Sequence, residues 1–119
     1  MKKTTISRDQ LTGIWAPLPV PWQRDGALDQ QIYARDIAQC CSSQINGVYS
    51  GGTTGEFYIQ DYDLFCEVNE VLIGTAHEHD TPVQAGCTAL GTVEVCKRVR
   101  FARSLGADLA GTSPLGWSG

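Results

Sequence analysis

The stretch Gly47-Val48-Tyr49-Ser50-Gly51-Gly52-Thr53-Thr54-Gly55-Glu56 decides the fold of this chain and points to its function. Val48 and Tyr49 are β-formers and predict a short strand. Four glycines within residues 47–55 contribute little to a core, but they let backbone N–H groups approach a ligand closely. Successive N–H groups of this kind can converge on one anion. We therefore predict an anion-binding loop at the carboxyl end of a strand, where α/β folds place their ligands.

Length and composition describe one ordinary globular domain. The 119 residues fit a single unit with a modest core. A net charge of −4 argues against a nucleic-acid partner, because such binders usually carry a basic face. No apolar stretch approaches the roughly 20 residues of a membrane span, and no hydrophobic region follows the basic residues 1–5. Neither a membrane anchor nor a signal peptide is predicted.

The five cysteines are predicted to be free thiols of a cytoplasmic protein. Their number is odd, and no Cys-x-x-Cys motif occurs. His77 and His79 offer two imidazoles for a metal ion, but no paired ligand motif accompanies them. We therefore predict no metal site and no cofactor.

Apolar periodicity predicts strands that alternate with helices. The expected strands cover residues 13–16, 48–49, 82–85 and 109–112, and the expected helices cover residues 30–43, 61–76 and 92–105. Asp29 and Thr92 are the expected N-caps of the first and third helices, and Gly106 fits the position after the third. This alternation implies parallel strand pairing through right-handed crossovers.

The glycine-rich loop also resembles the signature of a known enzyme family. Its segment Gly51-Gly52-Thr53-Thr54-Gly55-Glu56 is similar to the signature of the dihydrodipicolinate synthase / N-acetylneuraminate lyase family. Three other segments resemble the first, third and fourth strands of that family, in the right order and spacing. They are residues 13–22, Pro82-Val83-Gln84-Ala85-Gly86-Cys87, and Gly106-Ala107-Asp108 followed by Ser113-Pro114. Members of this family are pyruvate-dependent class I aldolases and lyases built on a TIM barrel.

The resemblance implies an α/β fold that forms part of a TIM barrel. A closed barrel needs eight βα units, roughly 250 residues. We therefore expect residues 1–119 to form one partial domain, the N-terminal half with about four βα units, which ends after the fourth strand. The residues alone also allow a small open sheet of the flavodoxin type, complete in itself.

The resemblance also assigns roles to residues of the loop. Thr54, with the backbone of Thr53 and Gly52, would bind the carboxylate of the substrate, and the Thr53 hydroxyl would join a proton relay with tyrosines. Gly55 and Glu56 would support the loop, Glu56 by accepting backbone N–H groups. From the residues alone, the loop could simply turn the chain, with its threonines satisfying local N–H groups.

A class I aldolase also needs a lysine that forms a Schiff base with the substrate ketone. The family carries this lysine on its sixth strand and a catalytic tyrosine on its fifth, and this sequence contains neither strand. Its lysines are Lys2, Lys3 and Lys97, the last beside two arginines on a helix, so none is a credible nucleophile. The 119 residues alone are therefore expected to be inactive.

Two departures from the family pattern bear on the substrate. Pro114-Leu115-Gly116 replaces a Pro-Tyr-Tyr segment whose second tyrosine completes the relay in dihydrodipicolinate synthase itself, and Val20 replaces a threonine. Both changes favour a relative that acts on another 2-oxo acid, such as a deoxy sugar acid or an adduct of an aromatic aldehyde. Trp117 would then line an apolar pocket.

We therefore predict a lyase, aldolase or dehydratase that acts on pyruvate or another 2-oxo acid and forms a tetramer or dimer at full length. The alternative is an inactive remnant or a stand-alone anion-binding α/β domain. A nucleotide-binding domain is disfavoured, because neither Gly-Lys-Ser/Thr nor Gly-x-Gly-x-x-Gly occurs at the loop.

Overall fold

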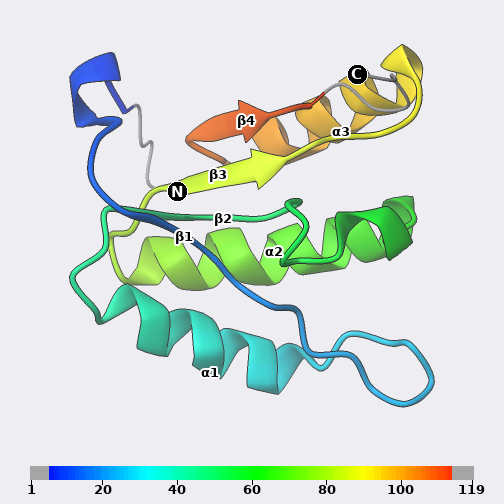
Figure 1. The fold of residues 1–119 in the computed structure, drawn as a ribbon, viewed down its shortest axis with the longest axis horizontal. Coiled ribbons are helices and arrows are strands. Elements are labelled where there is room, and N and C mark those ends of the chain that lie inside the picture. Colours follow the sequence, from blue (N-terminus) through cyan, green and yellow to red (C-terminus); the bar gives the residue numbers. More distant parts are fainter. Residues whose placement is uncertain (1–5, 114–119) are drawn as a thin grey trace.

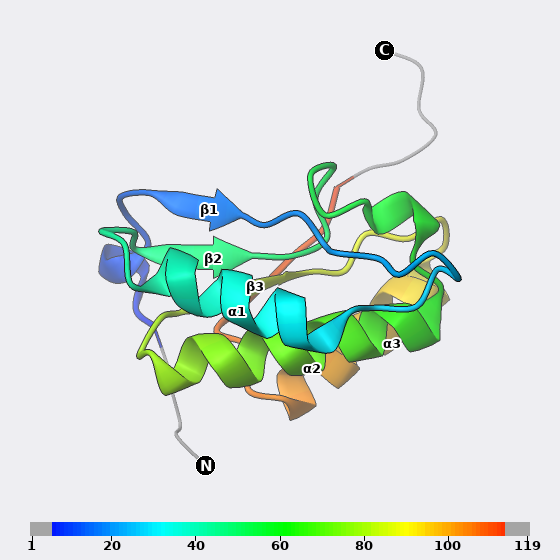
Figure 2. The ribbon, with the colours of Figure 1, turned by 90° about the horizontal axis from the view of Figure 1, so that it is seen from below.

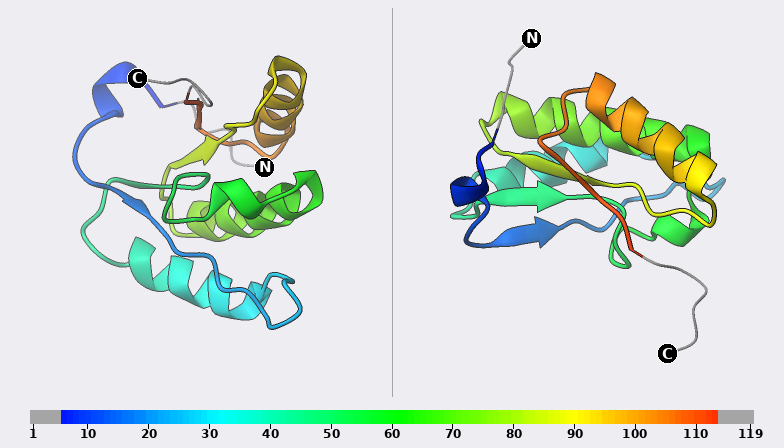
Figure 3. Two further views of the ribbon diagram at one scale, coloured as in Figure 1. Left: turned by 45° about the vertical axis from the view of Figure 1, so that its right-hand side comes forward. Right: turned by 90° about the horizontal axis from the view of Figure 1, so that it is seen from above.

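A computed structural model describes residues 6–113 as a parallel sheet covered on one side by helices (Figures 1 and 2). The strands are β1 (Trp15–Pro17), β2 (Gly47–Tyr49), β3 (Val83–Gly86) and β4 (Leu109–Gly111), and they lie in the order β1-β2-β3-β4. The helices are α1 (Gln30–Cys41), α2 (Tyr62–Glu78) and α3 (Thr92–Ser104), with short 3-10 turns at η1 (Arg8–Gln10) and η2 (Phe57–Ile59). Figure 3 (left) shows the strands following an arc with the helices along its outer side.

The core fills the space between the sheet and the helices. Side chains alternate along a strand, so one face of the sheet meets the helices and the other faces away. Val48 and Val83 pair in register on the helix side and are fully buried. Tyr49 and Gln84 pair in register on the opposite side and are only half-buried. In a closed barrel that second face points to the interior.

The predicted α/β class and the parallel order of four strands are confirmed. Each consecutive pair of strands is parallel and is joined by a helix, as the alternation of apolar patterns implied. Among the described strands, β1 and β4 each have one neighbour and therefore form the two edges of the sheet. Asp29 caps α1 as predicted, because its carboxylate accepts the backbone N–H of Ile32 at 3.1 Å.

Several predicted boundaries were wrong by one or two residues, among them the following three. The first strand begins at Trp15, because Gly13 adopts a left-handed φ of 82° that no strand residue uses. The first helix ends at Cys41, two residues before the predicted end. Thr92 is the first helical residue of α3, and extended Gly91 occupies the N-cap position without a side-chain bond.

The two helices α1 and α2 bury faces of different width. In α1 the buried residues are Tyr33 and Ile37, whereas Ile32 is 38% exposed. In α2, Leu64 near the start of the helix is only half-buried. This helix lies between α1 and α3 and so buries a wider face. Its buried residues are Phe65, Val68, Asn69, Leu72, Ile73 and Ala76.

Several features weighed in the sequence can now be placed. All five cysteines are free thiols, as predicted. His77, considered as a metal ligand, pairs instead with Asp108, with 3.0 Å between Nε2 and Oδ2. Within residues 6–113, no cluster of three or more His, Cys, Asp or Glu side chains could hold a metal ion. The helices of this described part are all too short or too polar to cross a bilayer.

Candidate functional site

The glycine-rich loop follows β2 at the edge of the sheet where the strands have their carboxyl ends. In Figure 2 it lies beyond the arrowheads of β1 and β2. Gly51 has a left-handed φ of 74° and packs directly on the backbone of Gly86 at the end of β3. A Cβ at either glycine would overlap the other strand, so two glycines are needed to bring the loop across β3.

Three carbonyl oxygens of the loop are bound by groups of the loop itself or of η2. Glu56 N–H donates to the Thr53 carbonyl at 3.0 Å, and Phe57 N–H donates to the Gly52 carbonyl at 3.3 Å. The side-chain amide of Gln60 donates to the Gly55 carbonyl at 2.8 Å. These three carbonyls are therefore already satisfied within the loop and the short turn that follows it.

The backbone N–H groups of residues 51–55 make no hydrogen bond to any residue of the described range 6–113. Thr53 and Thr54 are both exposed, and within that range their hydroxyls likewise have no partner. A loop that served only to turn the chain would use these hydroxyls for local N–H groups. Successive open donors beside two hydroxyls can instead bind an anion such as a carboxylate.

A buried polar cluster fixes the base of the loop. Ser50 Oγ donates to Asn69 Oδ1 at 2.6 Å and accepts the N–H of Gly86 at 3.2 Å. Asn69 in turn donates its amide to the Phe65 carbonyl at 2.9 Å. The cluster therefore joins β2, β3 and α2 below the loop. Sequence reasoning missed this cluster; the signal that could have found it is Asn69, a polar residue among the buried residues of α2.

Glu56 connects the loop to the chain that follows β1. The indole Nε1 of Trp22 donates to Glu56 Oε1 at 3.0 Å, whereas the sequence had pointed to backbone N–H partners. Glu56 also adopts a left-handed φ of 54°, which is uncommon for a residue with a side chain. The role of Glu56 in supporting the loop stays a prediction, now with Trp22 as its partner.

A cleft of about 490 Å³ lies beside the loop, between η2 and the start of α3. Phe57, Tyr58, Leu90, Glu94 and Arg98 contribute to its wall, but Thr53 and Thr54 do not. The cleft and the open donors of the loop are therefore separate features of the same edge.

The described residues include no nucleophile beside the loop. Lys97 lies on the exposed side of α3, with Nζ 3.8 Å from the centroid of the Tyr62 ring. Cys87 follows β3, and burial raises the pKa of its thiol to about 11, against a smaller lowering effect of Arg98. Lys2 and Lys3, and the predicted departures in residues 114–117, lie outside the described residues.

Parallel strands in an arc with helices on the outer side are the architecture of a TIM barrel, and the glycine-rich loop lies at the carboxyl ends, where such barrels bind their ligands. The described strands correspond to its N-terminal part, as predicted. A family model extends this to the sequence level: the Dihydrodipicolinate synthetase family model matches residues 10–112, and the chain belongs to that family.

Individual relatives agree with this membership. The chain is 30% identical to the 4-hydroxy-tetrahydrodipicolinate synthase of Ehrlichia canis over 88% of its own length. It is 29% identical to the trans-O-hydroxybenzylidenepyruvate hydratase-aldolase of Sphingobium xenophagum over 91% of its length. The chain spans 35% of the length of each of these relatives.

A solved structure confirms the shared fold. The dihydrodipicolinate synthase of Rhodopseudomonas palustris superposes with a TM-score of 0.85 at 22% identity. The match covers 93% of this chain and 36% of that one. The superposition therefore shows that this chain shares the fold of that structure.

Proposed function

We propose that this chain supplies the carboxylate-binding loop of a lyase or aldolase that acts on pyruvate or another 2-oxo acid. The observation that carries the proposal is the run of N–H groups at residues 51–55, which have no acceptor within the described residues, beside the exposed hydroxyls of Thr53 and Thr54. A 2-oxo acid presents a carboxylate next to its ketone. Hydrogen bonds to such a charged group are shorter and stronger than bonds between neutral groups.

In this proposal the two threonines have different tasks. The Thr54 hydroxyl and the backbone N–H groups of residues 52–54 bind the carboxylate and thereby place the ketone. The Thr53 hydroxyl passes a proton during the carbanion step, as the resemblance implies. The lysine that forms the Schiff base comes from a part of the protein beyond these 119 residues, since Lys97 lies on the exposed side of α3 with its Nζ over the Tyr62 ring.

The two named relatives suggest what the substrates share. A benzylidenepyruvate is an adduct of an aromatic aldehyde and pyruvate, and the hydratase-aldolase carries that substrate in its name. This chain is about as similar to the synthase as it is to the hydratase-aldolase, with 30% and 29% sequence identity. A loop that binds only the pyruvyl end suits either reaction, so the loop alone supports the class of 2-oxo acids and not one acceptor. We also propose that the full-length protein is a dimer or tetramer.

Borohydride trapping tests this function. The full-length protein, incubated with pyruvate and then reduced, should gain one reduced adduct on a lysine, because borohydride converts a Schiff base into a stable amine. The 119-residue chain treated in parallel should keep its mass. Absence of any adduct on the full-length protein would leave the alternative of an inactive, anion-binding domain. An adduct on Lys97 would show that the lysine assignment is wrong.

A further inference from the structure

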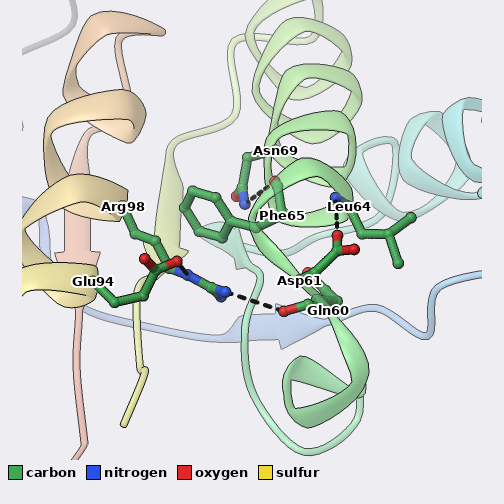
Figure 4. Close-up of polar contacts among 7 residues, drawn as sticks. All are labelled: Gln60, Asp61, Leu64, Phe65, Asn69, Glu94 and Arg98. Carbon is green, nitrogen blue, oxygen red and sulfur yellow. Dashed lines mark hydrogen bonds and ion pairs between the residues drawn. The ribbon is translucent and has the colours of Figure 1, made fainter. Parts of the chain in front are cut away.

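Arg98 is a buried arginine of α3 whose contacts lead to the glycine-rich loop (Figure 4). Only 7% of the residue is exposed. Its Nη2 donates to the main-chain carbonyl of Gln60 at 3.1 Å, and its Nε donates to Glu94 Oε1 at 3.1 Å. The guanidinium carbon lies 4.9 Å from the centroid of the Phe65 ring. Helix α3 is thus connected to the segment that closes the loop.

Gln60 continues this connection into the loop itself. It is buried, and its Nε2 donates to the Gly55 carbonyl at 2.8 Å. The peptide group that follows Gly55 also carries the N–H of Glu56, which donates to the Thr53 carbonyl at 3.0 Å. One rigid peptide plane is therefore held at its oxygen and at its nitrogen. That plane comes directly after the N–H groups of Thr54 and Gly55.

Stability alone is a weak reason for a buried guanidinium at this position. Removing a charge from water is costly, and an apolar side chain of similar volume is often as stable or more stable. Glu94, the ion-pair partner of Arg98, is itself 37% exposed in its side chain. What Arg98 provides, and an apolar side chain could not, is a donor for the Gln60 carbonyl.

We propose that Arg98, acting through Gln60, positions the Thr53–Thr54 loop for binding of the substrate carboxylate. Glycine-rich segments have many accessible backbone conformations, and ordering them on binding reduces affinity. The contacts from Arg98 to Gln60 and from Gln60 to Gly55 order the loop before the substrate arrives. Arg98 is a positioning residue in this inference, which rests on the function proposed above.

The test measures how much pyruvate is needed to fill the site. Full-length protein is equilibrated with increasing pyruvate, reduced with borohydride and analysed by mass. The plateau of trapped protein counts folded sites, and the half-saturating concentration reports the binding of pyruvate. The variants are Arg98→Met, Gln60→Leu and both together, with Arg100→Met as control, since Arg100 is exposed on the same helix.

Loss of the hydrogen bond from Arg98 to Gln60, or of that from Gln60 to Gly55, should raise the half-saturating pyruvate concentration roughly 2- to 13-fold, with the plateau unchanged. Because Arg98 acts on the loop through Gln60, the double variant should resemble Gln60→Leu alone. Arg98→Lys, which keeps a charged donor, should recover part of the loss. Arg100→Met should behave as the original protein.

The outcomes distinguish a failure of the role proposed for Arg98 from a failure of the proposed function. If the original protein traps no pyruvate, the proposed function fails and the inference fails with it. If the original protein traps pyruvate and the variants lower only the plateau, Arg98 and Gln60 merely stabilise the fold and the inference is wrong. Should Arg98→Met not fold, Gln60→Leu decides alone, because an unchanged half-saturation there contradicts the inference equally.

Discussion

The two ends of the sheet treat their polar groups in opposite ways. At the amino ends, Asp108 Oδ2 accepts the N–H of Val83 at 2.8 Å and the Nε2 of His77 at 3.0 Å, and the Asp108 side chain has no exposed surface. The main chain of Asp108 also donates to the Val83 carbonyl at 3.0 Å. At the carboxyl ends, the N–H groups of residues 51–55 have no acceptor within the described residues.

This difference separates groups that hold the fold from groups available to a ligand. Asp108 Oδ2 is shared between the backbone N–H of Val83 and the His77 ring, so both contacts hold the amino ends of the sheet together. The N–H groups of residues 51–55, which have no acceptor within the described residues, do not hold the fold together in this way. Changes at the amino ends should therefore reduce stability, whereas changes in the loop should reduce binding.

The largest effect is expected for Asp108→Ala. It leaves the N–H of Val83 and the His77 ring without their acceptor in a buried place. The free energy of unfolding, measured with urea on the full-length protein, should fall by roughly 2–5 kcal/mol. Asp108→Asn keeps an acceptor oxygen and should lose less. The half-saturating pyruvate concentration of the folded protein should not change, and a clear increase would contradict the division between the two ends.

Thr54→Val should have the next largest effect, and on binding only. Valine keeps the shape of threonine and removes its hydroxyl, so the substrate carboxylate loses one hydrogen bond. Such a loss costs about 1.5–3 kcal/mol, or roughly 10- to 150-fold in the half-saturating concentration of the 2-oxo acid. Thr54→Ser should restore most of it. Unchanged kinetic constants in Thr54→Val would show that the carboxylate is bound elsewhere.

Trp22→Phe tests whether the contact that supports Glu56 affects binding or stability. Phenylalanine keeps an aromatic ring at this position, but Glu56 loses the indole N–H whose Nε1 lies 3.0 Å from its Oε1. We expect a rise of roughly 2- to 13-fold in half-saturating pyruvate, as for one ordinary hydrogen bond. Unfolding by urea should be almost unaffected, because Trp22 is only half-buried. If Trp22→Phe lowered only the free energy of unfolding and left the half-saturating concentration unchanged, Glu56 would stabilise the fold and not the binding site.

Sequence reasoning succeeded where one local pattern determines the structure. The alternation of strands and helices, the Asp29 cap and the place of the glycine-rich loop all follow from spacing and turn chemistry. The contacts that hold the loop do not, since Arg98 and Gln60 are 38 residues apart and meet only in the folded chain. Lone arginines and glutamines in a sequence usually indicate exposed surface, and neither gave a signal of its buried role.

The smallest effect is expected when a thiol reagent is added, because Cys87 should hardly react. This experiment tests whether the end of β3 beside the loop is tightly packed. Cys87 directly follows β3 and is fully buried, and with a pKa of about 11 its thiol is about one part in a thousand thiolate at pH 8. Iodoacetamide should therefore modify exposed Cys96 first and leave Cys87 intact, as peptide mass analysis would show.

The pH dependence of the alkylation of Cys87 shows whether ionisation of its thiol limits the rate. If ionisation alone limits Cys87, its rate should rise about tenfold per pH unit between pH 8 and 10, because the thiolate is the reacting form. Alkylation of Cys87 at the rate of Cys96 at pH 8 would mean that the end of β3 opens readily. The N–H groups of residues 51–55, which lack acceptors within residues 6–113, would then reflect a loosely packed edge, and the case for a built carboxylate site would lose its structural basis.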